Sequence, residues 1–147
     1  MRVLFAIFLL LFAITVVNGA LGLTTLYECE TKTDANGDLI YNRDSLKMKC
    51  YHTAAMTSAY VGDVNQATDI CSAIFVDFGG VDIDGSDLTK VAELESNACY
   101  YDVAKIARDP NICELIIQRY DFQAQLFGDK VTKDNCLNEV CRLAQIV

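Results

Sequence analysis

The sequence predicts an all-α protein: an array of helical hairpins, about five helices in all, linked by disulfide bonds and preceded by a signal peptide. Three observations support this prediction. The chain of 147 residues begins with an apolar run of the kind that directs export. All seven cysteines follow that run, as in small secreted domains held by disulfides. From residue 44 onward, helix-capping residues precede segments in which apolar residues recur at helical spacing.

Residues 1–19 have the layout of a signal peptide. Arg2 precedes an apolar run that extends from Val3 to Val17, and small residues follow it, so we expect cleavage before Ala20. The alternative is an uncleaved membrane anchor, because the 21 residues 3–23 are long enough to cross a bilayer of about 30 Å. In both cases the residues from about 25 onward lie on the extracellular side, which predicts a secreted or envelope-associated protein.

The remaining chain, residues 20–147, is predicted to form a single helical, disulfide-rich domain. Removal of residues 1–19 takes away one arginine and no acidic residue, so the formal net charge changes from −8 to −9. This acidity argues against nucleic acids and against anionic membrane surfaces as partners, because both require clustered Lys and Arg. We expect an extracellular protein or an envelope component as partner, with membrane attachment only through an uncleaved leader.

The first part of this domain is expected to contain one turn and one long helix. Residues 21–32 are predicted as a short extended arm around Cys29. Asn36-Gly37 favours a turn that continues into a short hairpin, because both residues tolerate positive φ. Asp44 is placed to cap a helix over residues 45–60, which Gly62 ends.

Two helices are predicted in the middle of the chain. Asp63 and Gln66 have the spacing of a capping box and predict a helix that runs to about Val76. Ser86 or Asp87 is expected to cap a long helix over residues 88–108. Its apolar residues follow helical spacing, and Glu95 interrupts their stripe.

Two more helices complete the prediction. Asp109 is expected as an N-cap and Pro110 as the first residue of a helix that runs to about Phe127. Thr132 or Asp134 then caps the last helix. Four of its apolar residues share one face, which must be buried: Cys136, Val140, Leu143 and Val147.

Cysteine-centred segments recur along the chain. Residues 99–107 match residues 136–144 at Cys, Val and Ala and differ conservatively elsewhere, and residues 50–55 open in the same way. Residues 69–74 similarly echo residues 111–116. We interpret this as two and a half degenerate helical hairpins that stack to share a core. The alternative is chance similarity, since Cys-aromatic starts and Asp caps are frequent in helical proteins.

The segment from Cys50 to Ala144 resembles the short Cys-Tyr/Asp-x-x-Cys helical repeats of uncharacterised secreted proteins, many of them archaeal. The Cys-Tyr pairs at residues 50–51 and 99–100 carry this resemblance. It implies an all-helical fold. It implies no activity, because these proteins have none assigned.

The seven cysteines are predicted to form three disulfides with one cysteine left over. Cys50–Cys71 is expected across the hairpin that turns at Gly62, and Cys99 is expected to pair with Cys136 or Cys141 rather than with Cys113. Each bond stabilises the fold by about 2–4 kcal/mol. The odd cysteine is either a buried free thiol or the site of an intermolecular disulfide, which would give a linked dimer. The candidate disulfide cysteines are Cys29, Cys50, Cys71, Cys99, Cys113, Cys136 and Cys141.

One acidic segment is a candidate calcium site. Asp82, Asp84, Ser86 and Glu93 stand at positions 1, 3, 5 and 12 of an EF-hand loop, where hard Ca²⁺ finds oxygen ligands. However, Asp87 occupies position 6, where the sharp turn of that loop needs glycine. The preferred interpretation is therefore a solvated acidic turn that caps the next helix, with no cofactor.

No set of catalytic residues is apparent. His52 is the only histidine, and Cys50 points in a different direction on a helix, so no Cys/His pair forms locally. We expect His52 to be a surface or interface histidine. Six aromatic residues are expected in the core, although they are also candidates to line a pocket between hairpins: Tyr51, Tyr100, Tyr101, Tyr120, Phe122 and Phe127.

These features predict a non-enzymatic extracellular or envelope-associated protein with a binding or structural role. The alternative is an extracellular carrier of a small hydrophobic ligand, which requires an apolar cavity of about 300 Å³ or more. A hydrolase is a third hypothesis. It requires clustered carboxylates, or His52 in contact with a carboxylate in a cleft.

Overall fold

The computed structural model describes residues 24–80, 87–117 and 131–145. Helices dominate these residues, and the all-α prediction is confirmed. The described elements are α2 (Leu26–Thr31), α3 (Asp44–Tyr60), α4 (Val64–Phe78), α5 (Thr89–Ala107), the 3₁₀ helix η1 (Pro110–Leu115) and α6 (Lys133–Ala144).

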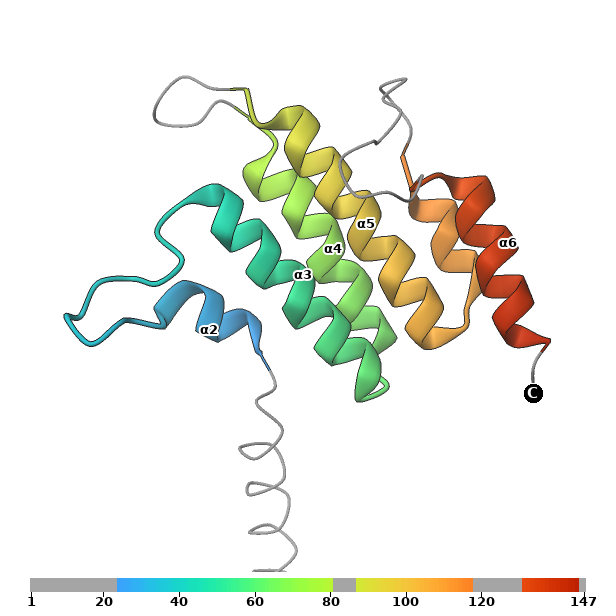
Figure 1. Ribbon diagram of the computed structural model, residues 1–147, viewed down its shortest axis with the longest axis horizontal. Helices are drawn as coiled ribbons and strands as arrows, with labels where there is room; N and C mark the ends of the chain where they lie inside the picture. Colours follow the sequence, from blue (N-terminus) through green and yellow to red (C-terminus); the bar gives the residue numbers. More distant parts are fainter. Residues whose placement is uncertain (1–23, 81–86, 118–130, 146–147) are drawn as a thin grey trace, which may run out of the picture.

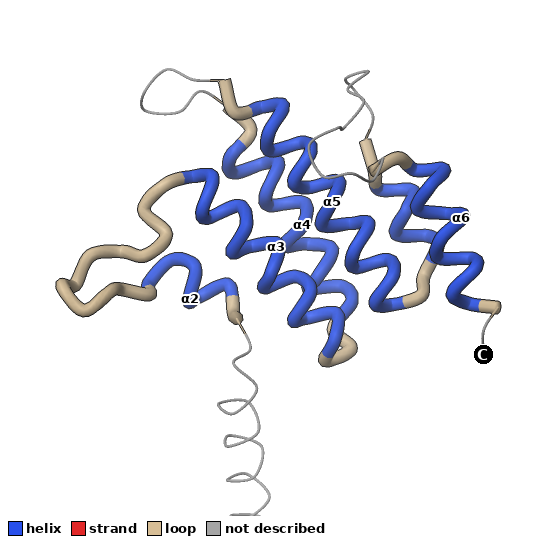
Figure 2. The backbone as a smooth tube through the Cα atoms, in the orientation of Figure 1, coloured by secondary structure: helices blue, strands red, loops and turns tan. Residues whose placement is uncertain are grey.

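The helices form a layer of long, roughly aligned rods with shorter elements on both flanks (Figures 1 and 2). Helices α3, α4 and α5 pack against one another in all three combinations and make a three-helix bundle. On one flank α2 packs on α3, and on the other η1 and α6 pack on α5 and on each other. Within the described residues, no helix is both long and apolar enough to span a bilayer.

The core is built largely from small residues. Ala55, Ala67, Ala92 and Ala104 are fully buried, as are all six bonded cysteines or nearly so. Small side chains let the helix axes approach closely, and the disulfides then fix the helices across these contacts. A few larger side chains fill the remaining space: Met48, Ile74, Val103 and Val140.

Several helix starts confirm the capping predictions. Asp63 accepts a hydrogen bond from the backbone N–H of Gln66, and Thr132 accepts one from that of Asn135. The Gln66 side chain accepts from the Ser58 hydroxyl, so only the Asp63 half of the predicted capping box forms. Asp109 accepts from Asn111 ahead of Pro110 at the start of η1. Asp44 differs from its prediction, because Arg43 is the N-cap and Asp44 lies in the first helical turn. There its carboxylate still faces the positive end of the helix dipole.

The prediction of an extended arm before Lys32 is wrong, because residues 26–31 form α2. Thr25 and Glu28 make a complete capping box: each side chain accepts a hydrogen bond from the other's backbone N–H. The turn at Asn36-Gly37 is confirmed, with Gly37 at φ 87°, and a single bridge joins Thr33 to Leu39.

The prediction of a helix from Pro110 to about Phe127 is also wrong, because η1 ends at Leu115 and Ile116 is extended. The cause is a tertiary contact with α5. The buried Asn97 side chain donates to the carbonyl of Ile117 at 2.7 Å and accepts from its N–H at 3.0 Å. Since both backbone groups of Ile117 are satisfied by this amide, the chain leaves the helical path there.

Each disulfide joins a cysteine to the next one along the chain. The bonds are Cys29–Cys50, Cys71–Cys99 and Cys113–Cys136, with Cα–Cα distances of 5.5–5.6 Å. They link α2 to α3, α4 to α5, and η1 to α6. The three pairs therefore tie together successive two-helix units.

The predicted Cys50–Cys71 bond is wrong. The sequence places the two cysteines at similar distances from the α3–α4 turn, but it does not show which side of each helix carries them. Cys50 lies on the side of α3 that meets α2, whereas Cys71 lies on the side of α4 that meets α5. Each cysteine therefore finds its partner across a different helix pair, at a Cα–Cα distance within the range that a disulfide needs.

The predicted bond from Cys99 to Cys136 or Cys141 is wrong as well, because Cys99 is bonded to Cys71. The expectation that Cys99 does not pair with Cys113 is confirmed. Cys136 is on the buried face of α6 that meets η1. Cys141 lies five residues on, a rotation of about 140° along the helix. It is therefore exposed and carries a free thiol, not a buried one. Of the predicted buried face of α6, Cys136 and Val140 are buried and Leu143 is half-buried. Val147 lies outside the described residues.

Candidate functional site

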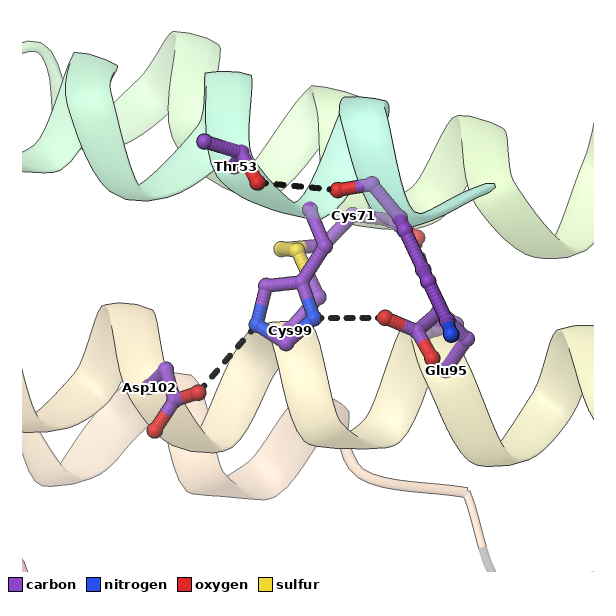
Figure 3. A network of polar contacts seen from close by, with 8 residues as sticks. Thr53, Cys71, Glu95, Cys99 and Asp102 are labelled. Atoms are coloured by element: carbon purple, nitrogen blue, oxygen red, sulfur yellow. Dashed lines mark hydrogen bonds and ion pairs between the residues drawn. A yellow bond between two sulfur atoms is a disulfide. The ribbon is translucent and has the colours of Figure 1, made fainter. Parts of the chain in front are cut away.

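The single histidine connects α3 to α5. Nδ1 of His52 lies 2.7 Å from Oε1 of Glu95, and Nε2 lies 3.2 Å from Oδ2 of Asp102. Figure 3 draws both contacts, with Glu95 and Asp102 on either side of the imidazole. The two carboxylates are seven residues apart on α5, two helical turns along one face, so one ring reaches both of them.

The surroundings of His52 fix its protonation state. Burial alone would lower the pKa of the imidazole, but the hydrogen bonds to Asp102 and Glu95 and the charges of both carboxylates raise it to about 9. His52 is therefore protonated at neutral pH. As an imidazolium it donates from both ring nitrogens, whereas the neutral ring has only one N–H to donate.

Asp102 contacts a second cation besides His52. Burial would raise its pKa, but the hydrogen bond from His52 and the charges of His52 and Lys105 hold the pKa below its usual value. Nζ of Lys105 lies 3.4 Å from the second oxygen of Asp102 and 5.0 Å from the ring centre of Tyr101. The Asp102 carboxylate is thus shared between His52 and Lys105, and the ring of Tyr101 lies beside Lys105.

An open pocket of about 380 Å³ lies against this cluster. One part of its lining is ionisable and includes the three residues of the His52 cluster. The other part is apolar and comes from α3, from α5 and from Val131, which lies just before α6. The lining residues are Lys49, His52, Thr53, Met56, Glu95, Ala98, Tyr101, Asp102, Lys105 and Val131.

The geometry of His52 suits a structural ion-pair bridge better than a general base. A base at neutral pH needs a pKa near 7 and one nitrogen free to face its proton donor. Both nitrogens of His52 contact carboxylates, and its pKa is about 9. The adjacent Thr53 hydroxyl is directed away, donating to the carbonyl of Lys49 at 3.0 Å. Cys50 is bonded to Cys29, so a Cys/His pair does not form.

A second pocket of about 320 Å³ lies where α2 begins and α3 gives way to α4. Its lining contains hydroxyl, amide and aliphatic side chains and no ionisable one: Thr24, Thr25, Leu26, Thr57, Ser58, Val61, Gln66 and Ile70.

Only one of the four calcium candidates lies within the described residues. Asp82, Asp84 and Ser86 lie outside the described residues, and Glu93 is on α5 with only 5% of its surface exposed. Across residues 24–80, 87–117 and 131–145, His, Cys, Asp and Glu side chains form no cluster of three or more suited to a metal ion. The calcium site stays a prediction.

Three of the six aromatic candidates belong to the core. Tyr51, Tyr100 and Tyr101 are at most 8% exposed. Tyr51 meets the edge of Phe78 and donates a hydrogen bond of 2.7 Å to Glu30. Tyr101 also lines the larger pocket. Tyr120, Phe122 and Phe127 lie outside the described residues.

Sequence reasoning missed the His52 cluster. Glu95 stood out only as an interruption of an apolar stripe, and Asp102 only as part of a repeat. Their seven-residue spacing places both on one face of α5 and is a usable signal. The sequence does not show that α3 lies opposite that face with a histidine at the right height.

Comparison with known protein families, with curated proteins and with solved structures finds no match for this chain. The resemblance to secreted helical repeat proteins therefore stays a prediction, and function must be argued from the site itself.

Proposed function

We propose that the protein is an exported, non-enzymatic binding protein, secreted or held at the cell envelope. Its site of action is the pocket between α3 and α5. The observation that carries this proposal is the His52 bridge: an imidazolium between Glu95 and Asp102 forms a rigid, charged wall beside an open pocket. The partner is an extracellular protein or an envelope component.

The composition of the pocket supports binding of a partner side chain or small group. Met56, Ala98 and Val131 offer apolar surface, while Lys49 and Lys105 place cations at the same opening. Binding sites commonly combine an apolar surface with a few positioned polar groups. The three disulfides and the predicted signal peptide at residues 1–19 are in keeping with work outside the cell.

A carrier of a small hydrophobic ligand is the second candidate. The size of the pocket, about 380 Å³, exceeds the 300 Å³ or so that this hypothesis requires. Half of its lining residues are Lys, His, Glu or Asp, and burying these charges against an apolar ligand costs free energy. A carrier using this pocket would therefore favour an amphiphilic ligand with a polar group at the charged wall.

A hydrolase is the third candidate, because His52 does contact two carboxylates beside an open pocket. Its high pKa and occupied nitrogens favour the bridging role. The free thiol of Cys141 adds a further proposal, a disulfide-linked dimer.

The test combines an activity screen with a binding measurement on the purified protein. Chromogenic ester, peptide and glycoside substrates are offered to the wild type and to His52→Gln, and we expect no turnover by either. Turnover that disappears in a folded His52→Gln variant would overturn the proposal and favour the hydrolase.

The binding arm compares two substitutions of similar size. Met56→Arg fills the pocket, and Asn65→Arg changes an exposed position on α4. Binding to immobilised, lipid-free envelope proteins is expected to fall several-fold for Met56→Arg and to be unchanged for Asn65→Arg. Equal retention of both variants would show that the pocket is not the binding site.

A further inference from the structure

One end of the molecule exposes large apolar side chains together. Tyr27 and Leu26 at the start of α2 are 76% and 37% exposed. Tyr60 and Val61, at the turn between α3 and α4, are 72% and 63% exposed. We call these four residues the base surface.

The two halves of the base surface lie side by side. Leu26 and Val61 both line the pocket of about 320 Å³ described above. Figure 1 places the beginning of α2 and the α3–α4 turn along the same lower edge of the fold. Residues more than 30 apart in sequence therefore form one continuous end of the bundle.

The chemistry of the base surface suits the headgroup region of a bilayer. The pocket at its centre offers hydroxyl and amide groups and no ionisable side chain. Tyrosine is enriched at membrane–water interfaces, where the ring meets acyl chains and the hydroxyl meets water. The flanking carboxylates of Glu28 and Asp63 each accept a hydrogen bond from a backbone N–H at a helix start.

The chain enters the described fold at this same end. Thr24 lines the pocket of about 320 Å³, and it directly follows residues 3–23, a segment that contains the apolar run and is long enough to cross a bilayer. We propose that the uncleaved alternative holds for residues 3–23: they cross a membrane, and the base surface rests on its outer face. The domain then stands on the bilayer with α3 and α4 pointing away from it.

A second copy of the chain fits this surface less well. Stable protein interfaces use about 20–30 residues a side. The base surface has four exposed apolar residues around a hydroxyl-lined pocket. A bilayer needs no such area here, because residues 3–23 supply the attachment, and a zwitterionic surface needs no clustered basic residues.

The test uses the full chain in phosphatidylcholine vesicles, where tryptophan reports depth. The protein contains no tryptophan, so a single substitution supplies the only indole. Tyr60→Trp places it at the base, and Val76→Trp is the matched control. Val76 is 71% exposed against 72% for Tyr60, and it lies about 18 Å further along α4 from the turn.

With brominated phosphatidylcholine, we expect the fluorescence of Tyr60→Trp to be quenched several-fold more than that of Val76→Trp. Equal quenching of the two variants overturns the proposal, as does a full chain that fails to float with the vesicles. Neither result touches the α3–α5 pocket, so the binding proposal stands or falls separately. Circular dichroism confirms that both variants keep the helical fold.

Discussion

The hydroxyl of Tyr101 donates a hydrogen bond to the carboxylate of Glu139, and this pair repeats the contact of His52 with Asp102 one interface earlier. His52 and Tyr101 each stand two residues after a bonded cysteine, Cys50 and Cys99. Asp102 and Glu139 each stand three residues after a bonded cysteine of the facing helix, Cys99 on α5 and Cys136 on α6.

The α3–α5 and α5–α6 interfaces therefore share one register. A donor on α3 meets an acidic residue on α5, and a donor on α5 meets an acidic residue on α6. This agreement is what stacked hairpins predict. The disulfide-bonded units are α2–α3, α4–α5 and η1–α6, shifted by one helix from the hairpins expected from sequence. The repeat itself stays a prediction.

We predict that His52→Ala destabilises the fold by about 1–3 kcal/mol, because it removes two charge-assisted hydrogen bonds and leaves the largely buried Glu95 without its cation. Guanidinium unfolding under non-reducing conditions measures this change. Thr53→Ala, at the exposed neighbouring position, is the control and should stay within about 0.5 kcal/mol of the wild type. A His52→Ala variant as stable as this control would contradict the bridging role.

The same bridge predicts a pH dependence of stability. The pKa of His52 rises from 6.5 to about 9 on folding, so its contribution is complete below about pH 6.5 and is lost as the pH rises through 9. The pKa of Asp102 is lowered from 3.8, so its contribution is complete above about pH 4 and is lost in acid. The stability difference between wild type and His52→Gln should therefore be largest between about pH 4 and 6.5.

Nuclear magnetic resonance provides a direct check, because His52 is the only histidine in the chain. The imidazole resonances of the folded protein should titrate with a midpoint near 9. In urea-unfolded protein the midpoint should return to about 6.5. A folded midpoint near 6.5 would mean that the carboxylates do not hold the ring.

We also predict that the folded protein has one titratable thiol, that of Cys141, and three disulfides between consecutive cysteines. Replacing Cys71 and Cys99 together by alanine should cost about 2–5 kcal/mol. Cys141→Ser should leave stability nearly unchanged, because the residue is exposed, and should abolish any disulfide-linked dimer on a non-reducing gel. Peptide mapping that recovers a Cys50–Cys71 bond, or seven free thiols, would refute this framework.

Local signals in the sequence predicted the caps of α4, η1 and α6 correctly. The predicted caps of α3 and α5 are wrong, because Arg43 and Leu88 are the N-cap residues there and neither makes a side-chain cap. An N-cap such as Asp63, Asp109 or Thr132 acts through backbone groups two or three residues away, so its effect is legible in the sequence. The capping box of Thr25 and Glu28 carried the same kind of signal and was overlooked in favour of an extended arm.

Features that depend on tertiary contacts were not predictable. The end of η1 is set by Asn97, twenty residues earlier in the chain, and the disulfide partners depend on which side of each helix a cysteine occupies. The His52 cluster joins residues 43 and 50 positions apart. Helical spacing identifies a face, but the neighbour of that face follows only from the packing of α3, α4 and α5.

The shared register yields a final prediction, that Tyr101 and Glu139 couple across the α5–α6 interface as His52 and Asp102 couple across α3–α5. Tyr101→Phe removes only the hydroxyl and should cost about 0.5–1.5 kcal/mol. Glu139→Ala removes the acceptor, whereas Glu139→Gln should cost less because an amide oxygen still accepts the bond. A double-mutant cycle of Tyr101→Phe and Glu139→Ala should therefore give a clear coupling energy, and Tyr101→Phe with Asn138→Ala, an exposed neighbour on α6, should be additive. Additivity of Tyr101→Phe and Glu139→Ala would mean that the contact contributes nothing to stability and that the two interfaces correspond only in sequence spacing.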